Sequence, residues 1–220
     1  MGTPAAVVIA AVAGYLLGSV PVAQLVARRE GVDLFAVGDR NPGYWNARGH
    51  LSRRASALVF AGDAGKGALA AALGRALAGP WWVGYVAAGA AMVGHAWPVF
   101  AHFRGGRSVL TFVGAMAILS LIAAAISAAV CAGVTLVSRR FAWGARAGVF
   151  GFPVVQAFLE PRAHVAATGA LMCFIGLRFA MAAVDDRRHA ASAVPPAPPR
   201  ALRAHESGGE AGDSRSVGEG

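Results

Sequence analysis

Long apolar runs alternate with short polar connections along most of the chain. The runs cover residues 5–27, 55–78, 81–100, 108–137, 141–159 and 163–184. Most of them approach or exceed the roughly 20 residues that an α-helix needs to cross the hydrocarbon core of a bilayer. The pattern therefore predicts an all-α, polytopic membrane helical bundle.

The run over 108–137 is too long for one ordinary span. At about 1.5 Å rise per residue it makes either one strongly tilted helix or two short helices. Only two passes place the arginines near 139–146 and 187–188 on the same side as the other arginine-rich loops. We therefore expect a turn near Leu119–Leu121, and about seven transmembrane helices in all, some of them short.

Arginines in the connections predict how the bundle is oriented. The connection over 28–54 carries six arginines, which the positive-inside rule assigns to the cytoplasm. The first run has Arg28 and Arg29 directly after it and no basic residue before it, the reverse of a cleaved signal peptide. We therefore expect a retained first span with the N-terminus outside the cell.

Composition supports a protein embedded in a lipid bilayer. Hydrophobic residues make up 56% of the chain, charged residues make up 14%, and the mean hydropathy is +0.54. The net charge of +9 is explained first by topogenic arginines, so no nucleic-acid partner is expected. The two cysteines lie in apolar runs without metal-ligand spacing, so neither a metal nor another cofactor is expected.

The composition changes after Val184. Residues 195–199 are rich in proline, and the segment that follows is rich in glycine, serine and acidic residues. Such a segment buries too little apolar surface to offset its chain entropy. The sequence thus predicts an integral membrane domain over 1–184 and a disordered cytoplasmic tail over 185–220.

The single lysine of the chain, Lys66, lies inside the apolar run over 55–78. A charge there costs about 2.5–3.5 kcal/mol on insertion scales, so it normally has a partner or a function. Asp63 lies on the same helical face and can neutralise it as a purely structural pair. All the other residues of the lysine-plus-arginine set are arginines, so we favour a functional need for a compact ammonium at this position.

Two loops on the expected cytoplasmic side carry further candidate binding residues. The first covers 38–48 and contains Asn41, Gly43 and Asn46. These residue types permit left-handed backbone and present amide groups, which suits a loop folded around a polar ligand. An ordinary juxtamembrane turn explains the same residues, so both interpretations stay open.

The second loop lies within residues 94–111. Gly105 and Gly106 precede an apolar helix that begins near Ser108, so their amides and the helix N-terminus can bind an anion, with Arg107 adding charge. His95 is either a packing residue or, as we favour, a functional one. Together these clusters predict an anion-binding pocket on the cytoplasmic side with a hydrocarbon base. Such a pocket suits a ligand with a phosphate head and an acyl tail.

The second loop also carries a resemblance to a known family. Gly-His-Ala-Trp-Pro-Val-Phe over 94–100 and Phe-Arg-Gly-Gly-Arg over 103–107 resemble the signature of bacterial acyl-phosphate:glycerol-3-phosphate acyltransferases of the PlsY type. Gly-Ser-Val-Pro over 18–21 and Asp-Ala-Gly-Lys-Gly over 63–67 resemble motifs of that family's first two helices. The resemblance extends in order and spacing over about residues 14–180.

The resemblance implies a seven-helix enzyme of the bacterial inner membrane with sites that face the cytoplasm. Such an enzyme transfers an acyl group from acyl phosphate to the 1-hydroxyl of glycerol 3-phosphate, giving lysophosphatidic acid for phospholipid biosynthesis. An acyl phosphate is a mixed anhydride with a good leaving group, so positioning and electrostatics are the protein's main tasks. No oligomeric state follows from the resemblance.

The resemblance also suggests roles for the candidate residues. Phosphate would be held by Lys66, Arg107 and the amides of Gly105 and Gly106. The glycerol moiety would be held by the first loop, through Asn41, Gly43 and Asn46. His95 is the first candidate for the general base, and Asp63 would orient Lys66 or His95. The phosphate of the donor is an alternative proton acceptor.

The chain departs from the family pattern at several positions. Asp39 and Gly49 stand where the family has serine and arginine, and Arg107 stands where it has lysine. The family's C-terminal His-x-x-Asn-x-x-Arg pattern is replaced by Asp-Asp-Arg-Arg-His over 185–189. These departures leave open a catalytically impaired relative that binds phosphorylated lipid or acts as a membrane scaffold. A small transporter with charges in broken helices is a third hypothesis, which offers no reason for the signature over 94–107.

Overall fold

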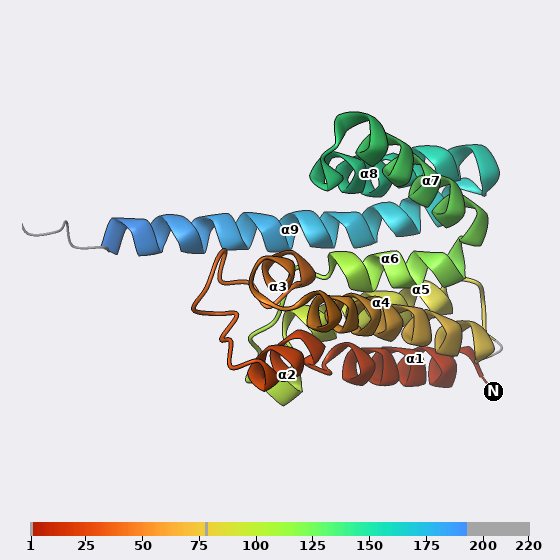
Figure 1. Ribbon diagram of the computed structural model, residues 1–220. Coiled ribbons are helices and arrows are strands. Elements are labelled where there is room, and N and C mark those ends of the chain that lie inside the picture. The colour runs from red at the N-terminus through yellow and green to blue at the C-terminus, as the bar shows by residue number, and fades with distance from the viewer. Residues whose placement is uncertain (1, 78, 193–220) are drawn as a thin grey trace, which may run out of the picture. The chain divides into compact units, whose positions relative to one another are not determined.

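The computed structural model describes residues 2–77 and 79–192, and every regular element within them is helical (Figure 1). The elements are α1 (Thr3–Gly18), α2 (Val22–Arg29), α3 (Tyr44–His50), α4 (Arg53–Ala76), α5 (Val83–Ala96), a 3₁₀ turn η1 (Val99–Ala101), α6 (Val109–Leu119), α7 (Leu121–Ser138), α8 (Phe141–Leu159) and α9 (Arg162–Ser192). The chain divides into two units, residues 1–181 and 182–220. The bundle described below belongs to the first unit.

Several of these helices have the length and hydropathy of membrane spans. Five segments of the described residues qualify, namely Thr3–Arg29, Arg53–Ala76, Val83–Ala101, Leu121–Ser138 and Arg162–Arg188, and Val109–Leu119 is a shorter apolar helix. Together with α8, which contains Pro153, these six segments correspond to the seven predicted transmembrane helices. The prediction of an all-α polytopic bundle with some short helices is confirmed.

The long run over 108–137 contains two helices, as its arginine-rich flanks predicted. α6 ends at Leu119 and α7 begins at Leu121, so the break falls at Ser120. The Ser120 hydroxyl donates a hydrogen bond to the Glu160 carboxylate, and Gln156 Nε2 lies 3.2 Å from the same hydroxyl. A polar side chain at the break is therefore paired within the bundle, which lowers the cost of interrupting a helix there.

The last helix is longer than its apolar run. The sequence analysis ended this helix at residue 184 and assigned 185–220 to a disordered tail, whereas α9 continues to Ser192. The prediction is thus wrong for 185–192, where charged residues follow the apolar run without a glycine or proline to end the helix. The remainder of the predicted tail, 193–220, lies outside the described residues.

Glycines let the central helices approach closely. A β-carbon at Gly18 would lie 2.0 Å from the Ala91 carbonyl oxygen, so α1 packs backbone-to-backbone against α5. A β-carbon at Gly67 would lie 1.9 Å from the Thr111 carbonyl oxygen, so α4 packs in the same way against α6. Small residues at helix crossings are typical of membrane bundles. The helices α4 and α5, which carry the candidate catalytic residues, also pack against each other.

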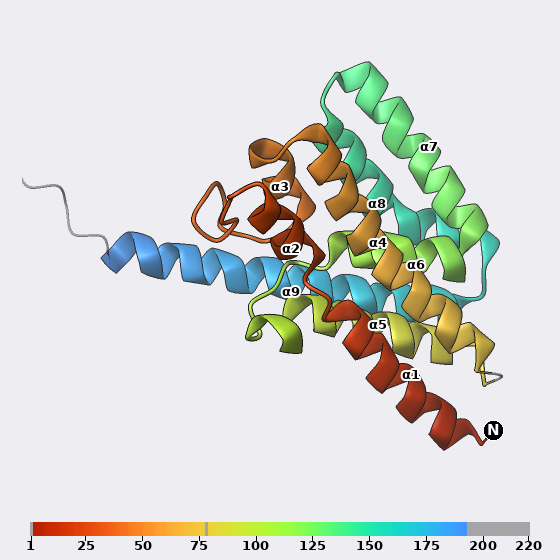
Figure 2. The same ribbon diagram turned by 60° about the horizontal axis from the view of Figure 1, so that its bottom comes forward.

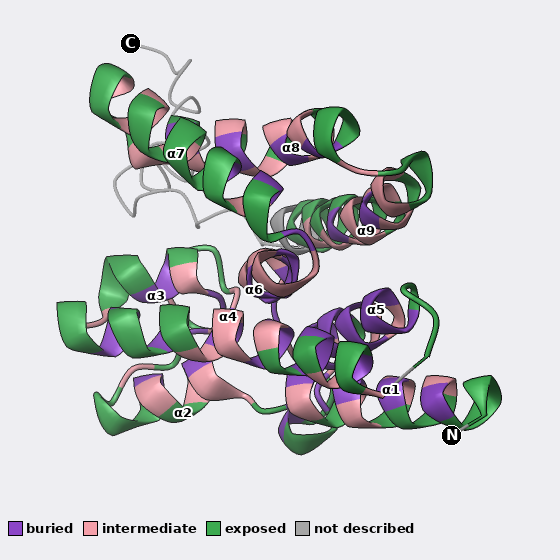
Figure 3. Ribbon diagram, turned by 90° about the vertical axis from the view of Figure 1, so that its right-hand side faces the viewer, coloured by how far each residue is buried: buried purple, intermediate pink, exposed green. Residues whose placement is uncertain are grey.

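Burial differs sharply between the inner and outer helices. α5 is mostly buried, whereas α7 is mostly exposed, as the purple and green ribbons of Figure 3 show. The exposed side chains of α7 include Leu121, Ile122 and Leu136, and α7 packs along α8 (Figure 2). Large apolar side chains on the outside suit a helix that faces lipid rather than water.

Candidate active site

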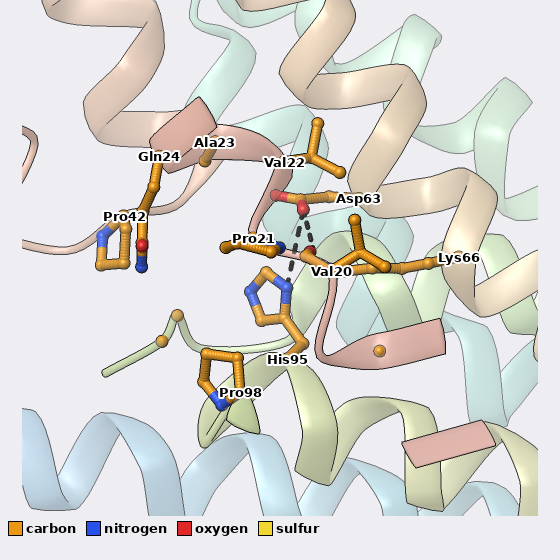
Figure 4. Close-up of a pocket in the computed structure, with 13 residues that line it drawn as sticks. Val20, Pro21, Val22, Ala23, Gln24, Pro42, Asp63, Lys66, His95 and Pro98 are labelled. Carbon is orange, nitrogen blue, oxygen red and sulfur yellow. Dashed lines mark hydrogen bonds and ion pairs between the residues drawn. The ribbon is translucent and has the colours of Figure 1, made fainter. Parts of the chain in front are cut away.

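Asp63 and Lys66 form a buried ion pair on α4. Their side chains are 2% and 6% exposed, and Lys66 Nζ lies 2.9 Å from Asp63 Oδ1. Lys66 Nζ also donates a hydrogen bond of 3.2 Å to the carbonyl of Val20, in the break between α1 and α2 (Figure 4). The pairing predicted from the three-residue spacing is confirmed, and the ammonium is held by one oxygen from α4 and one from the break between α1 and α2.

His95 joins this pair from the last turn of α5. Its Nδ1 atom lies 3.6 Å from Asp63 Oδ1, and its side chain is 7% exposed. In Figure 4 the His95 imidazole points toward the Asp63 carboxylate and approaches it from the side that faces away from the α4 backbone. The Asp63 carboxylate thus stands between a cation and an imidazole, where its charge stabilises the ammonium and any proton that His95 gains.

The two glycines of the second loop fit closely around His95. The Gly106 amide donates a 3.1 Å hydrogen bond to the His95 carbonyl, and a β-carbon at Gly106 would lie 2.4 Å from His95 Nε2. A β-carbon at Gly105 would lie 2.0 Å from the same carbonyl oxygen. Only glycine fits at Gly105, where the clash is with backbone, whereas a side chain at Gly106 would require the His95 ring to shift. The Gly106 amide is already used within the protein, so it is not available to an anion in this conformation.

Arg178 of α9 also contacts the second loop, and the sequence analysis did not single it out. Its Nε and Nη2 atoms donate hydrogen bonds of 3.4 and 3.3 Å to the Gly106 carbonyl, and its guanidinium lies 4.7 Å from the centre of the Trp97 ring. The signal that drew attention to Lys66, a cation within an apolar run, applies equally to Arg178.

In the first loop, Asn46 is engaged with backbone. Asn46 Nδ2 donates hydrogen bonds of 2.9 Å to the carbonyls of Leu34 and Val37, and the residue is 5% exposed. Gly38 has φ +57°, and a β-carbon there would lie 2.1 Å from Asn46 Oδ1. The structure therefore gives Asn46 a role in shaping the loop, and its contact with substrate stays a prediction.

Asp39 ties the first loop to the second. Asp39 Oδ2 accepts a 2.9 Å hydrogen bond from Arg107 Nη1, and the Arg107 guanidinium lies 4.8 Å from the centre of the Phe179 ring. Two of the departures from the family pattern thus form an ion pair with each other. The Arg107 cation, which we expected to hold phosphate, faces a carboxylate of the protein itself.

The cluster lines a small pocket. Asp63, Lys66, His95, Gly105 and Gly106 line it together with Pro42 of the first loop, whereas Asn41, Gly43, Asn46 and Arg107 do not. Its volume is about 10 Å³, which is space for roughly one water molecule. The structure therefore brings together five of the nine predicted site residues in a narrow pocket, and a larger ligand requires the lining residues to move apart.

A helical membrane bundle with a buried Asp–Lys–His cluster beneath a glycine loop defines an integral membrane protein with a polar site at one end of its helices. A family model described as glycerol-3-phosphate acyltransferase matches residues 8–187. The chain belongs to the glycerol-3-phosphate acyltransferase family, as the resemblance over 94–107 predicted.

Individual relatives and solved structures agree with this assignment. A glycerol-3-phosphate acyltransferase of Rubrobacter xylanophilus is 50% identical over 102 residues, which are 46% of this chain and 51% of the relative. A glycerol-3-phosphate acyltransferase of Laribacter hongkongensis is 37% identical over 164 residues, which are 71% of this chain and 81% of the relative. The chain thus spans about half the length of the first relative and most of the second.

The fold is also similar to that of PlsY (YgiH), an integral membrane glycerol 3-phosphate acyltransferase, in its glycerol 3-phosphate form. The TM-score is 0.71 at 28% sequence identity, and the match covers 78% of this chain and 87% of the PlsY chain. A match of this extent shows that the chain shares its architecture with a solved member of the family.

Proposed function

We propose that this protein transfers an acyl group from an acyl phosphate to the 1-hydroxyl of glycerol 3-phosphate and forms lysophosphatidic acid. The observation that carries the proposal is the buried cluster of Asp63, Lys66 and His95 beneath the Gly105–Gly106 loop. Its membership of the glycerol-3-phosphate acyltransferase family supports it, as does the similarity to PlsY structures in glycerol 3-phosphate and lysophosphatidic acid forms. The protein would act in the membrane of a bacterial cell.

The reaction needs positioning and charge rather than a covalent intermediate. The acceptor hydroxyl oxygen bonds to the acyl carbon, the bond from that carbon to the phosphate oxygen breaks, and inorganic phosphate leaves with the electron pair. Lys66 would stabilise the phosphate of the acyl donor, because a compact ammonium in a dry site acts strongly on developing negative charge. Arg107 would bind the second phosphate once it is released from Asp39.

The proton of the hydroxyl requires an acceptor. His95 would take it, and Asp63, whose Oδ1 lies 3.6 Å from His95 Nδ1, would stabilise the imidazolium that forms. The departing phosphate is the alternative acceptor. Asn41 and Gly43 would contact the glycerol moiety after the first loop has moved, and Asn46 would hold that loop in shape through Leu34 and Val37.

We further propose that the site opens to the cytoplasm. The loop over 28–54 and the loop over 104–107 carry arginines and lie at the end of the helices that holds the pocket. The positive-inside rule then places the N-terminus outside and the C-terminal tail in the cytoplasm. Glycerol 3-phosphate would reach the pocket from water, and the acyl donor from the bilayer.

An acyl-transfer assay tests the proposed function. Purified protein in detergent is incubated with palmitoyl phosphate and radiolabelled glycerol 3-phosphate, and lysophosphatidic acid is separated and counted. We expect product with palmitoyl phosphate, and none with palmitoyl-coenzyme A in its place. Lack of product at saturating substrates would overturn the enzyme proposal, and lipid binding without turnover would favour the impaired relative. That alternative is not favoured, because the motifs around Asp63, Lys66 and His95 are retained.

A further inference from the structure

A second and larger groove adjoins the narrow pocket that contains Lys66. Its volume is about 600 Å³, and it lies between α2, the connection over 31–35 and the segment over 100–104. Pro21 and Gln24 line both the groove and the pocket that contains Lys66. Figure 1 shows the short yellow-green segment after α5 lying next to α2. The pocket and the groove are therefore neighbours on either side of Pro21 and Gln24.

The charged residues of the groove are mostly cationic. Arg28 from α2 and Arg104 from the opposite wall line it with His102, and Asp33 is the acidic residue among its lining residues. Asp33 Oδ1 accepts a 2.9 Å hydrogen bond from the backbone amide of Phe35. The Asp33 carboxylate keeps its negative charge, but two guanidinium groups from different walls outnumber it and leave the groove with a net positive charge that favours anions.

Arg104 is held in place before any ligand arrives. Its guanidinium lies 4.4 Å from the centre of the Phe35 ring, and its carbonyl accepts a 2.8 Å hydrogen bond from Gln24 Nε2. Stacking on an aromatic ring restricts a guanidinium to one plane, and the Gln24 contact fixes its backbone to α2. Less conformational freedom is lost when such a group binds a phosphate.

The rim of the groove is apolar and exposed. Leu25 and Phe100 line it and are 49% and 59% exposed, and Phe103, beside the segment, is 58% exposed. His102 and Phe103 both have positive φ, 53° and 59°, a conformation that costs free energy in residues other than glycine. The turn thus presents apolar aromatic side chains outward beside the groove, where they can cover part of a hydrocarbon chain.

We propose that this groove binds the phosphate headgroup of a single-chain phosphomonoester lipid, and that its occupant is lysophosphatidic acid on its way from the pocket to the bilayer. The inference rests on the proposed function for the source of that lipid. A phosphomonoester approaches two negative charges at neutral pH, which matches two guanidinium groups. The acyl chain would lie along Leu25 and Phe100, and the groove volume is within the usual range for small-molecule sites.

Direct binding tests this site without relying on catalysis. Full-length protein in detergent is titrated with lysophosphatidic acid, without acyl donor, and bound lipid is counted by native mass spectrometry. Arg28→Gln/Arg104→Gln is compared with Arg53→Gln/Arg54→Gln, which removes the same charge from exposed positions at the start of α4. We expect affinity to fall by about tenfold in the groove variant only, because two charge-assisted contacts are lost. The same loss is expected in a Lys66→Ala background, in which binding at the pocket is weakened.

Equal affinities in the groove and control variants would overturn the site. Competition by inorganic phosphate at the same concentration would contradict a role for the acyl chain. Competition by the phosphodiester lipid phosphatidylglycerol as strong as that by lysophosphatidic acid would identify bulk lipid as the occupant and overturn the assignment. If the double variant does not fold, Arg28→Gln alone, at an exposed position of α2, is titrated instead. If the protein binds the lipid in this groove but makes no product in the acyl-transfer assay, the proposed function is refuted and the groove site is not.

Discussion

The carboxylate of Asp39 and the guanidinium of Arg107 meet at 2.9 Å, and they join two loops that are 68 positions apart in the sequence. The pocket that holds Lys66 has space for about one water molecule. The ion pair therefore connects the two loops that contribute Pro42, Gly105 and Gly106 to the lining of this narrow pocket. It also neutralises a cation that we assign to substrate phosphate.

Removing the Asp39 carboxylate should make it easier for glycerol 3-phosphate to bind. In Asp39→Asn, Arg107 keeps its position but loses a competing anion, so we expect KM for glycerol 3-phosphate to fall several-fold with kcat little changed. The effect should shrink at high ionic strength, because the pair is partly exposed and screened by salt. Steady-state kinetics at varied glycerol 3-phosphate and salt concentrations measure it.

A double-mutant cycle with Arg107→Gln supplies the control. If Asp39 acts through Arg107, its substitution should have little effect once Arg107 has been replaced. The same decrease in KM in both backgrounds would show that Asp39 acts elsewhere.

A methyl group at Gly106 should disturb the His95 ring. The added β-carbon would lie 2.4 Å from His95 Nε2, so either the ring or the loop has to move. We expect Gly106→Ala to lower kcat/KM by at least about tenfold, since small misplacements of catalytic groups are costly. Gly65→Ala is the matched control on α4, because a β-carbon there meets nothing within 4 Å. Equal activities of the two variants would contradict the placement of His95.

The polar cluster at the α6–α7 break should make stability depend on pH. Burial raises the pKa of Glu160, but hydrogen bonds from Ser120, Gln156 and His164 outweigh it and leave the pKa below its ordinary value of 4.5. A pKa lowered by folding contributes stability that is complete above the unfolded-state pKa and is lost as pH falls through the folded-state pKa. The contribution should therefore be complete at neutral pH and should decline once the pH falls below the ordinary value of 4.5.

Thermal unfolding in detergent at several pH values measures this contribution. We expect the difference in Tm between the wild type and Glu160→Gln to be largest near pH 7 and to shrink on acidification. A difference that stays constant over that range would show that the charge of Glu160 does not contribute.

The local features of this protein were predictable from its sequence. The Asp63–Lys66 pair followed from spacing on one helix, and the break at Ser120 followed from the placement of arginines around an overlong apolar run. Both predictions depend on residues close in sequence or on one simple rule about the bilayer. The resemblance over 94–107 added the family and the loop that covers His95.

The features that were missed depend on tertiary contacts. The contact of Asp39 with Arg107 and that of Arg178 with the Gly106 carbonyl join distant segments, and no periodicity reveals them. Asn46 was assigned to substrate because amides suit polar ligands, yet its hydrogen-bond donors are engaged by the carbonyls of Leu34 and Val37. A side chain's residue type limits its partners, but the fold decides which partner it meets.

The most direct test of the account is the effect of Lys66→Ala on acyl transfer from palmitoyl phosphate to glycerol 3-phosphate. The variant should fold, as judged by its thermal unfolding, and should form lysophosphatidic acid at least about 100-fold more slowly than the wild type, a loss of about 2.7 kcal/mol of transition-state stabilisation. A folded Lys66→Ala protein that works at the wild-type rate would contradict the assignment of this cluster to catalysis.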